Sequence, residues 1–183
     1  ADHVFPVETN NFISALRSVV REEIEDSAAP AIYTNYPYSM TQVDNTLYAT
    51  LRICGKAVEL HHMVRFERKS HSENNLRNVL QSLRYIQLRQ NVRYFYTDNV
   101  AAAFTGTLYP YFVITATCAL MFDASGSRGL FIHNEPAALA QLYGQAASLF
   151  AECEPLAAFP KTILQAKALN EPLVYTGVKS YLV

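Results

Sequence analysis

The sequence predicts an α/β fold (α+β in the broad sense), with a mixed sheet of four to five strands covered by three to four helices. Half of the 183 residues are hydrophobic and 17% are charged, so the chain can bury a sizeable core. Helical and strand periodicities alternate between residues 44 and 98, which predicts parallel strands joined by a right-handed crossover. A polar loop at 123–127 separates two apolar strands and predicts an antiparallel hairpin in the same sheet.

The first predicted helix can be capped by Asn10 or Asn11. Its apolar residues recur at helical spacing, and they are Phe12, Leu16, Val19, Val20 and Ile24. Acidic residues crowd its C-terminal end, where the helix dipole disfavours negative charge. We therefore expect that end to fray or to meet a cation. Pro30 and the tyrosine-rich residues 33–38 predict an irregular connection to the next element.

The following residues predict the parallel unit. A helix begins near Asp44, and beyond Gly55 residues 58–66 alternate as in a strand, with a continuous helix as the alternative. The clearest helix runs over Leu76–Leu88, and a strand follows at Asn91–Asp98. One side of that helix carries an apolar stripe, which consists of Leu76, Val79, Leu80, Leu83 and Ile86.

The second half of the chain predicts the hairpin. The run Tyr111–Phe122 is almost entirely apolar or threonine, which is typical of one central strand buried on both faces. Residues 129–132 return as its partner, and Asn134 caps a helix with Pro136 in its first turn. The predicted buried stripe of this helix is Leu139, Leu142, Tyr143, Ala146 and Phe150.

We expect one domain over residues 1–183. It consists of an N-terminal helix and tyrosine-rich connection (1–43), an α/β core (44–156) and a C-terminal appendage (157–183) with a candidate strand at 173–175. The chain begins with alanine, which indicates either a processed start or a fragment of a longer protein, and we expect the fragment. No apolar run approaches the roughly 20 residues that span a bilayer, and no signal-peptide pattern is present. Three cysteines, an odd number set far apart, predict reduced thiols and a cytoplasmic location.

Motifs for catalysis, metals and cofactors are missing from the sequence, so we predict no catalytic residue, no metal ligand and no cofactor. His61 and His62 are adjacent, and on a strand they face opposite sides, so they cannot share one ion. There is no Cys-x₂-Cys, no Gly-x-Ser-x-Gly and no P-loop. Cys118 lies in the most apolar strand without a neighbouring base, and we expect it to be inert.

Charge and tyrosines provide the binding hypothesis. The net charge is −1, but residues 52–93 contain nine basic and three acidic side chains. This segment can attract a small anionic effector, a phosphate backbone or an acidic partner, or it can be a solvated helix face. Tyrosines at 31–38, 94–96 and 109–112 suit a small-molecule pocket or simple core packing. The candidate ligand-binding residues are Arg65, Arg68, Arg93, Tyr94, Tyr96, Tyr109 and Tyr111.

The order of several motifs resembles a known family. These motifs are Ala57–Leu60, the Leu76–Leu88 helix with Asn91–Arg93, Tyr109–Thr115, Gly129–Asn134 and Phe150–Leu156. The segment from about Leu47 to Leu156 is similar to the C-terminal effector region of bacterial helix-turn-helix transcriptional regulators, and to one half of a phospholipase D-like fold. Phospholipase D enzymes carry a His-x-Lys-x₄-Asp signature, and no histidine of this chain is followed two residues later by lysine.

The resemblance implies a non-catalytic ligand-sensing or dimerisation domain of a bacterial transcriptional regulator. Such a module is expected to form a homo-oligomer and to reach DNA only through a separate N-terminal domain. Two alternatives stay open. One is a small cytosolic enzyme with an acid–base site among Glu59, His61, His62 and Asp98. The other is a nucleic-acid-binding module that uses residues 52–93 and whose binding weakens steeply with salt.

Overall fold

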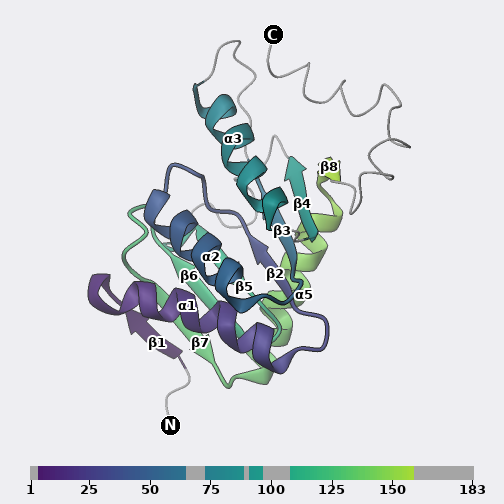
Figure 1. Cartoon of the computed structure of the whole chain (residues 1–183). Helices are drawn as coiled ribbons and strands as arrows, with labels where there is room; N and C mark the ends of the chain where they lie inside the picture. The colour runs from purple at the N-terminus through teal and green to yellow at the C-terminus, as the bar shows by residue number, and fades with distance from the viewer. Residues whose placement is uncertain (1–3, 65–72, 89–90, 97–107, 159–183) are drawn as a thin grey trace.

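The computed structural model describes residues 4–64, 73–88, 91–96 and 108–158 (Figure 1). In these ranges eight strands form one sheet in the order β1-β7-β6-β5-β2-β3-β4-β8. The strands are β1 Val4–Val7, β2 Ala31–Thr34, β3 Glu59–Met63, β4 Asn91–Tyr96, β5 Tyr111–Ile114, β6 Cys118–Phe122, β7 Gly129–His133 and β8 Glu154–Ala158. The described helices are α1 Thr9–Asp26, α2 Thr41–Cys54, α3 Glu73–Gln87 and α5 Pro136–Ala151.

The sheet is mixed, which confirms the predicted α/β class. Strands β2, β3 and β4 are parallel, with α2 and α3 as the crossovers, while β5, β6, β7 and β1 continue antiparallel on one side. Strand β8 adds antiparallel to β4 at the other edge. The sheet has more strands than the predicted four to five because β1, β2 and β8 were not predicted and the predicted strand at 111–122 forms both β5 and β6. Strand β2 occupies the start of the stretch that was predicted as an irregular connection.

The run Tyr111–Phe122 is not one strand, contrary to the sequence prediction. It folds back between β5 and β6, whose residues pair antiparallel. The backbone N–H of Thr115 donates to the Cys118 carbonyl at 2.9 Å, and the Cys118 N–H donates to Thr115 Oγ1 at 3.0 Å. Because a threonine hydroxyl supplies this turn, no Gly, Pro or Asn marks it in the sequence.

Helix boundaries differ slightly from the prediction. Helix α1 follows Glu8 at its N-cap, two or three residues before the predicted Asn10 or Asn11 cap. Helix α5 follows Glu135, and Asn134 instead takes a left-handed backbone conformation with φ of 56°. The helices themselves are confirmed, since differences of this size are usual at helix ends.

The two faces of the sheet carry separate cores. Helices α1 and α2, with Tyr85 of α3, pack on one face against residues such as Ile32, Leu60 and Leu120. Helix α5 packs on the other face through Leu139, Ala146 and Phe150. The predicted stripe of α1 is buried in full, and that of α5 is buried or partly buried.

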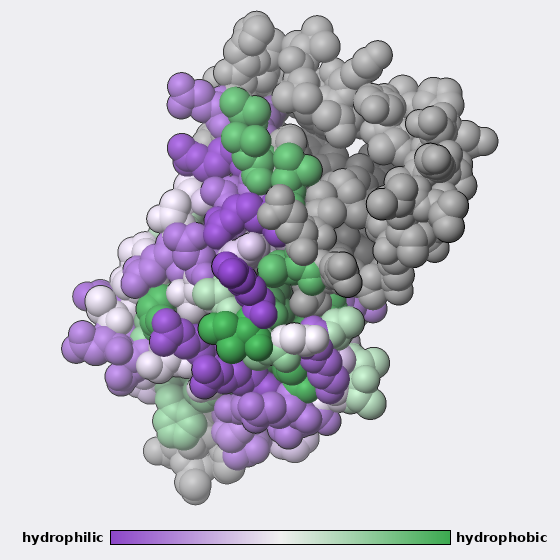
Figure 2. Space-filling view, viewed as in Figure 1, coloured by the Kyte–Doolittle hydropathy of each residue, from purple (hydrophilic) through white to green (hydrophobic). Residues whose placement is uncertain are grey.

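Helix α3 exposes three leucines of its predicted apolar stripe. Leu76, Leu80 and Leu83 expose 53%, 54% and 46% of their surface, and Figure 2 shows an apolar patch over this helix. The helix instead buries the polar side with Asn78, Ser82 and Tyr85. A polar network fixes this orientation, as described below. Among the described helices none has the length and apolarity needed to cross a membrane.

Candidate functional site

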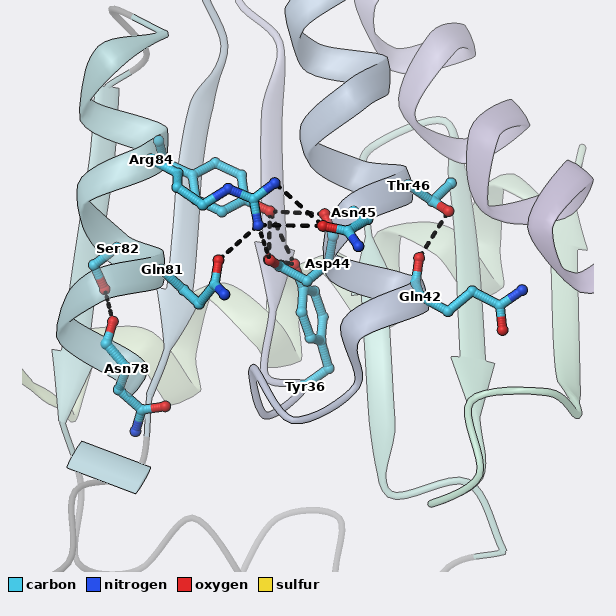
Figure 3. A network of polar contacts seen from close by, with 10 residues as sticks. Tyr36, Gln42, Asp44, Asn45, Thr46, Asn78, Gln81, Ser82 and Arg84 are labelled. Atoms are coloured by element: carbon cyan, nitrogen blue, oxygen red, sulfur yellow. Dashed lines mark hydrogen bonds and ion pairs between the residues drawn. The ribbon is translucent and has the colours of Figure 1, made fainter. Parts of the chain in front are cut away.

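A buried carboxylate joins three elements next to the carboxyl ends of β2 and β3 (Figure 3). Asp44 lies in the first turn of α2 and is 1% exposed. Its Oδ1 accepts hydrogen bonds from the hydroxyls of Tyr36 at 3.0 Å and of Tyr85 at 2.7 Å. Tyr36 follows β2 and Tyr85 belongs to α3, so the carboxylate ties both helices to the sheet.

Arg84 covers this network from the solvent side. Its guanidinium donates to Asp44 Oδ2 at 3.2 Å, to Asn45 Oδ1 at 3.2 Å and to Gln81 Oε1 at 2.6 Å. It also lies over the ring of Tyr48, 4.4 Å from the ring centroid, where a cation–π attraction is expected. The arginine is one-third exposed and the carboxylate is buried, so the charge of Asp44 is compensated at the protein surface.

The electrostatics of the network favour a structural role. The pKa of Asp44 lies above its ordinary value, because burial outweighs the hydrogen bonds from Tyr85 and Tyr36 and the charge of Arg84, which lower it. Burial also raises the pKa of Tyr36 and Tyr85 well above that of a free tyrosine, so both hydroxyls stay protonated donors. The carboxylate receives three donors and is not a free general base. The network locks α2 and α3 onto the sheet.

The two adjacent histidines lie on opposite faces of β3, as predicted. His62 is fully buried between Tyr36 and Tyr38, with ring centroids 4.7 Å apart in each case. Its Nε2–H donates to the Tyr36 carbonyl at 2.8 Å, which fixes the proton on Nε2 because a carbonyl only accepts. Burial lowers the pKa of His62 to about 4, so the ring is neutral at physiological pH.

His61 lies on the α5 face, where it stacks on Tyr33 with centroids 4.5 Å apart. Its Nε2 is 3.3 Å from Glu59 Oε1. The structure therefore brings together two of the four acid–base candidates, and the sheet separates them from His62. Asp98 lies outside the described residues.

A third cluster contains Glu22 of α1, Cys118 of β6 and His133 of β7, three residues that were not predicted as ligands. The Cys118 thiol donates to Glu22 Oε2 at 2.6 Å, and His133 Nε2 is 3.0 Å from the same oxygen. Burial, reinforced by the hydrogen bond to Glu22, raises the pKa of Cys118, so its thiol is protonated. Only the pairing of the predicted hairpin offered a signal, since it sets Cys118 opposite His133.

Glu23 and Lys56 position the end of α1 above this cluster. The buried Glu23 carboxylate accepts from the backbone N–H of Ala31 at 3.1 Å and of Ala116 at 3.2 Å. Lys56 Nζ donates to the carbonyls of Ile24 at 2.8 Å and Ser27 at 2.7 Å. The predicted meeting of this acidic helix end with a cation is thus confirmed, and Glu22 is held next to β6.

The predicted ligand-binding residues lie on separate parts of the sheet. Arg65 and Arg68 are outside the described residues, and Arg93, Tyr94 and Tyr96 belong to β4. Tyr109 precedes β5, and Tyr111 begins it and packs against Phe122 with centroids 6.0 Å apart. Strands β2 and β3 stand between β4 and β5, a separation of roughly 14 Å at usual strand spacing. The role of these residues in ligand binding stays a prediction.

The basic side chains of residues 52–93 lie in two kinds of environment. Lys56 and Arg84 are engaged with α1 and with Asp44, as described above. Arg52 and Arg77 are exposed on α2 and α3. Part of the predicted positive segment thus serves the fold and part faces solvent.

Comparison with known proteins bears on the fold. No family model matches the chain, and no curated protein sequence matches it significantly. Among solved structures, Nuc from Salmonella typhimurium, a phospholipase D family member, is similar with a TM-score of 0.50 and 10% identity. The match covers 83% of this chain and 96% of Nuc. This likeness is one of fold, in agreement with the phospholipase D-like arrangement expected from the motif order.

A second similar structure is TrmBL2, an archaeal chromatin protein described with a novel mode of DNA binding. Its TM-score is 0.49 with 10% identity, over 85% of this chain. The chain spans about half of that protein, 54% of its length.

Proposed function

We propose that this chain is a non-catalytic recognition module on a phospholipase D-like scaffold, which senses a ligand or mediates assembly. The regulator context implied by the sequence resemblance, including a bacterial source, a homodimer and a separate DNA-binding domain, belongs to this proposal. So do the cytoplasmic location and the small anionic effector.

The observation that supports the proposal most directly is that the chain lacks the His-x-Lys-x₄-Asp signature of phospholipase D enzymes. The signature places lysine two residues after histidine. The five histidines of this chain are followed at that spacing by Phe5, Met63, Val64, Glu73 and Glu135. None of these side chains offers the positive charge that the signature lysine would present to a phosphate. The given sequence therefore lacks the groups with which phospholipase D enzymes are equipped.

The described polar groups support the same view. The Asp44 carboxylate accepts hydrogen bonds from Tyr36, Tyr85 and Arg84. His62 is buried and donates to a backbone carbonyl. These internal hydrogen bonds commit these groups to holding the scaffold together.

The test combines turnover with ligand binding. The full chain is incubated with bis(p-nitrophenyl) phosphate, and its thermal unfolding is followed against a panel of anionic metabolites and nucleotides. We expect no hydrolysis above buffer and a raised Tm with one ligand class. A ligand at a hundred times its Kd adds about 2.7 kcal/mol, which corresponds to a shift of roughly 5–10 °C for a chain of this size.

Variants locate the responding site. Arg93→Ala and Tyr111→Phe test the predicted ligand residues, and Arg17→Ala, an exposed residue of α1, is the matched control. Hydrolysis that follows the chain through successive purification steps would contradict the non-catalytic assignment. If no ligand of the panel raises the Tm, ligand sensing is refuted. If the chain is also a monomer in sedimentation experiments, the assembly role is refuted as well.

A further inference from the structure

Three potential metal ligands converge at the end of α1 on the outer half of the sheet. Glu22, Cys118 and His133 each present one ligand atom, and all three atoms lie within 4.8 Å of one another. Carboxylate oxygen, thiolate sulfur and imidazole nitrogen are the three ligand types that proteins use for zinc. The geometry points to a zinc site formed by Glu22, Cys118 and His133.

The fold brings these residues together by two independent devices. Cys118 and His133 are directly opposite in the β6–β7 ladder, where side chains of one sheet face stand about 5 Å apart. Glu22 comes from α1, which Glu23 ties to the turn between β5 and β6 through Ala116 and Thr117. The three ligands are far apart in the sequence, so they form no metal-binding spacing motif that would predict the site.

The separations between the ligand atoms are within about 1 Å of those that a tetrahedral zinc ion requires. Metal–ligand distances of about 2.0–2.3 Å place neighbouring ligand atoms about 3.3–3.7 Å apart. The separations from Glu22 Oε2 are 2.6 Å to the Cys118 sulfur and 3.0 Å to His133 Nε2, and none within the cluster exceeds 4.8 Å. The Glu22 side chain is 30% exposed, so it can withdraw by the required fraction of an ångström.

Ligand chemistry selects the metal class. A thiolate is a soft ligand and disfavours Mg²⁺ and Ca²⁺, whereas a mixed sulfur, nitrogen and oxygen set suits Zn²⁺. Three protein ligands leave a fourth position for water or an external ligand. The ion has an entry path, since His133 and Glu22 are each about one-third exposed while Cys118 is buried beneath them.

Binding exchanges a proton for the ion. In the structure the Cys118 thiol donates its hydrogen to Glu22, which also faces His133. When a zinc–sulfur bond forms, the S–H bond breaks and the proton leaves to the buffer, as metal sites with cysteine require. No redox step is involved.

The experiment titrates the chelator-treated full chain with Zn²⁺ alone, and separately with Co²⁺ as a spectroscopic substitute. We expect one ion per chain, a raised Tm, and a thiolate-to-cobalt charge-transfer band. Cys118→Ser should abolish the band. Because that buried change can impair folding, Glu22→Gln and His133→Asn provide a second route, and each should weaken zinc binding by at least about tenfold.

Matched controls separate this site from adventitious binding. Cys153→Ser removes a half-buried thiol outside the cluster, and Glu25→Gln removes an exposed carboxylate from the same helix. Neither should change zinc stoichiometry or affinity. Zinc binding that is absent from the wild-type chain, or that is equal in wild type, Glu22→Gln and His133→Asn, would overturn the inference. The proposed function is tested by other measurements, so either result can fail without the other.

Discussion

Neutral burial of His62 predicts a loss of stability in mild acid. The pKa of an unfolded histidine is about 6.5, and burial lowers the pKa of His62 to about 4 in the folded chain. Between these two pH values the unfolded chain binds a proton that the folded chain does not bind. Stability is therefore complete above pH 6.5 and falls as the pH is lowered towards 4. At 1.36 kcal/mol per unit the whole loss is about 3 kcal/mol, of which about 2 kcal/mol is reached by pH 5.

The measurement is urea unfolding at several pH values from 8 to 4, for wild type and for His62→Gln and His62→Phe. The chain has 12 tyrosines and no tryptophan, so circular dichroism or tyrosine fluorescence reports unfolding. Carboxylates also titrate in this range, and the difference between wild type and variant cancels them. The two variants fill the site differently and should differ in stability at pH 8, yet both should lose the His62 contribution to the acid slope. Identical pH dependence in wild type and both variants would refute the reasoning.

Three further predictions concern the scaffold. Asp44→Ala should lower the free energy of unfolding by about 2–4 kcal/mol, because the buried hydroxyls of Tyr36 and Tyr85 lose the carboxylate that accepts from both. A loss below about 1 kcal/mol in urea unfolding would contradict the network. Gly129→Ala should cost more than about 2 kcal/mol, since a Cβ there would overlap a backbone carbonyl of β6. In Gly144→Ala of α5 the added Cβ has no atom within 4 Å, so this change should be neutral or stabilising by up to about 1 kcal/mol. Equal effects of the two glycine changes in thermal unfolding would exclude the steric explanation. Lys56→Met frees two carbonyls at the end of α1 and should cost about 1 kcal/mol, with faster amide exchange confined to that helix end; unchanged exchange there would show that Lys56 does not hold it.

Periodicity predicted α1 and α5 well, because each of these helices buries one regular side that the structure keeps. Strand β3 forms where alternation predicts it, although the structure buries residues on both of its faces. The turn at Thr115 and the central strand β2 were not predictable in this way. The first uses a hydroxyl in place of a turn residue, and the second is only four residues long between two helices.

The orientation of α3 shows a different limit. Its leucines form the strongest apolar stripe of the chain, yet three of them are exposed because Tyr85 on the opposite side must reach Asp44. Tertiary hydrogen bonds decided which side is buried, and no local pattern contains that information. The candidate metal cluster was hidden for the same reason, since its three ligands come from a helix and two strands that only the sheet register aligns.

The C-terminal end of α1 violates local helix preference for an identifiable reason. Carboxylates there oppose the helix dipole, and a sequence under selection for helix stability alone would place lysine or arginine instead. In the structure Glu23 fastens the helix to two backbone amides, Lys56 supplies the missing positive charge, and Glu22 points at Cys118 and His133. Glu23 and Lys56 explain how the unfavourable charge is tolerated, but they do not require a carboxylate at position 22. Local rules are commonly broken where a functional site needs it, and a ligand for an ion is the role that the contacts of Glu22 fit.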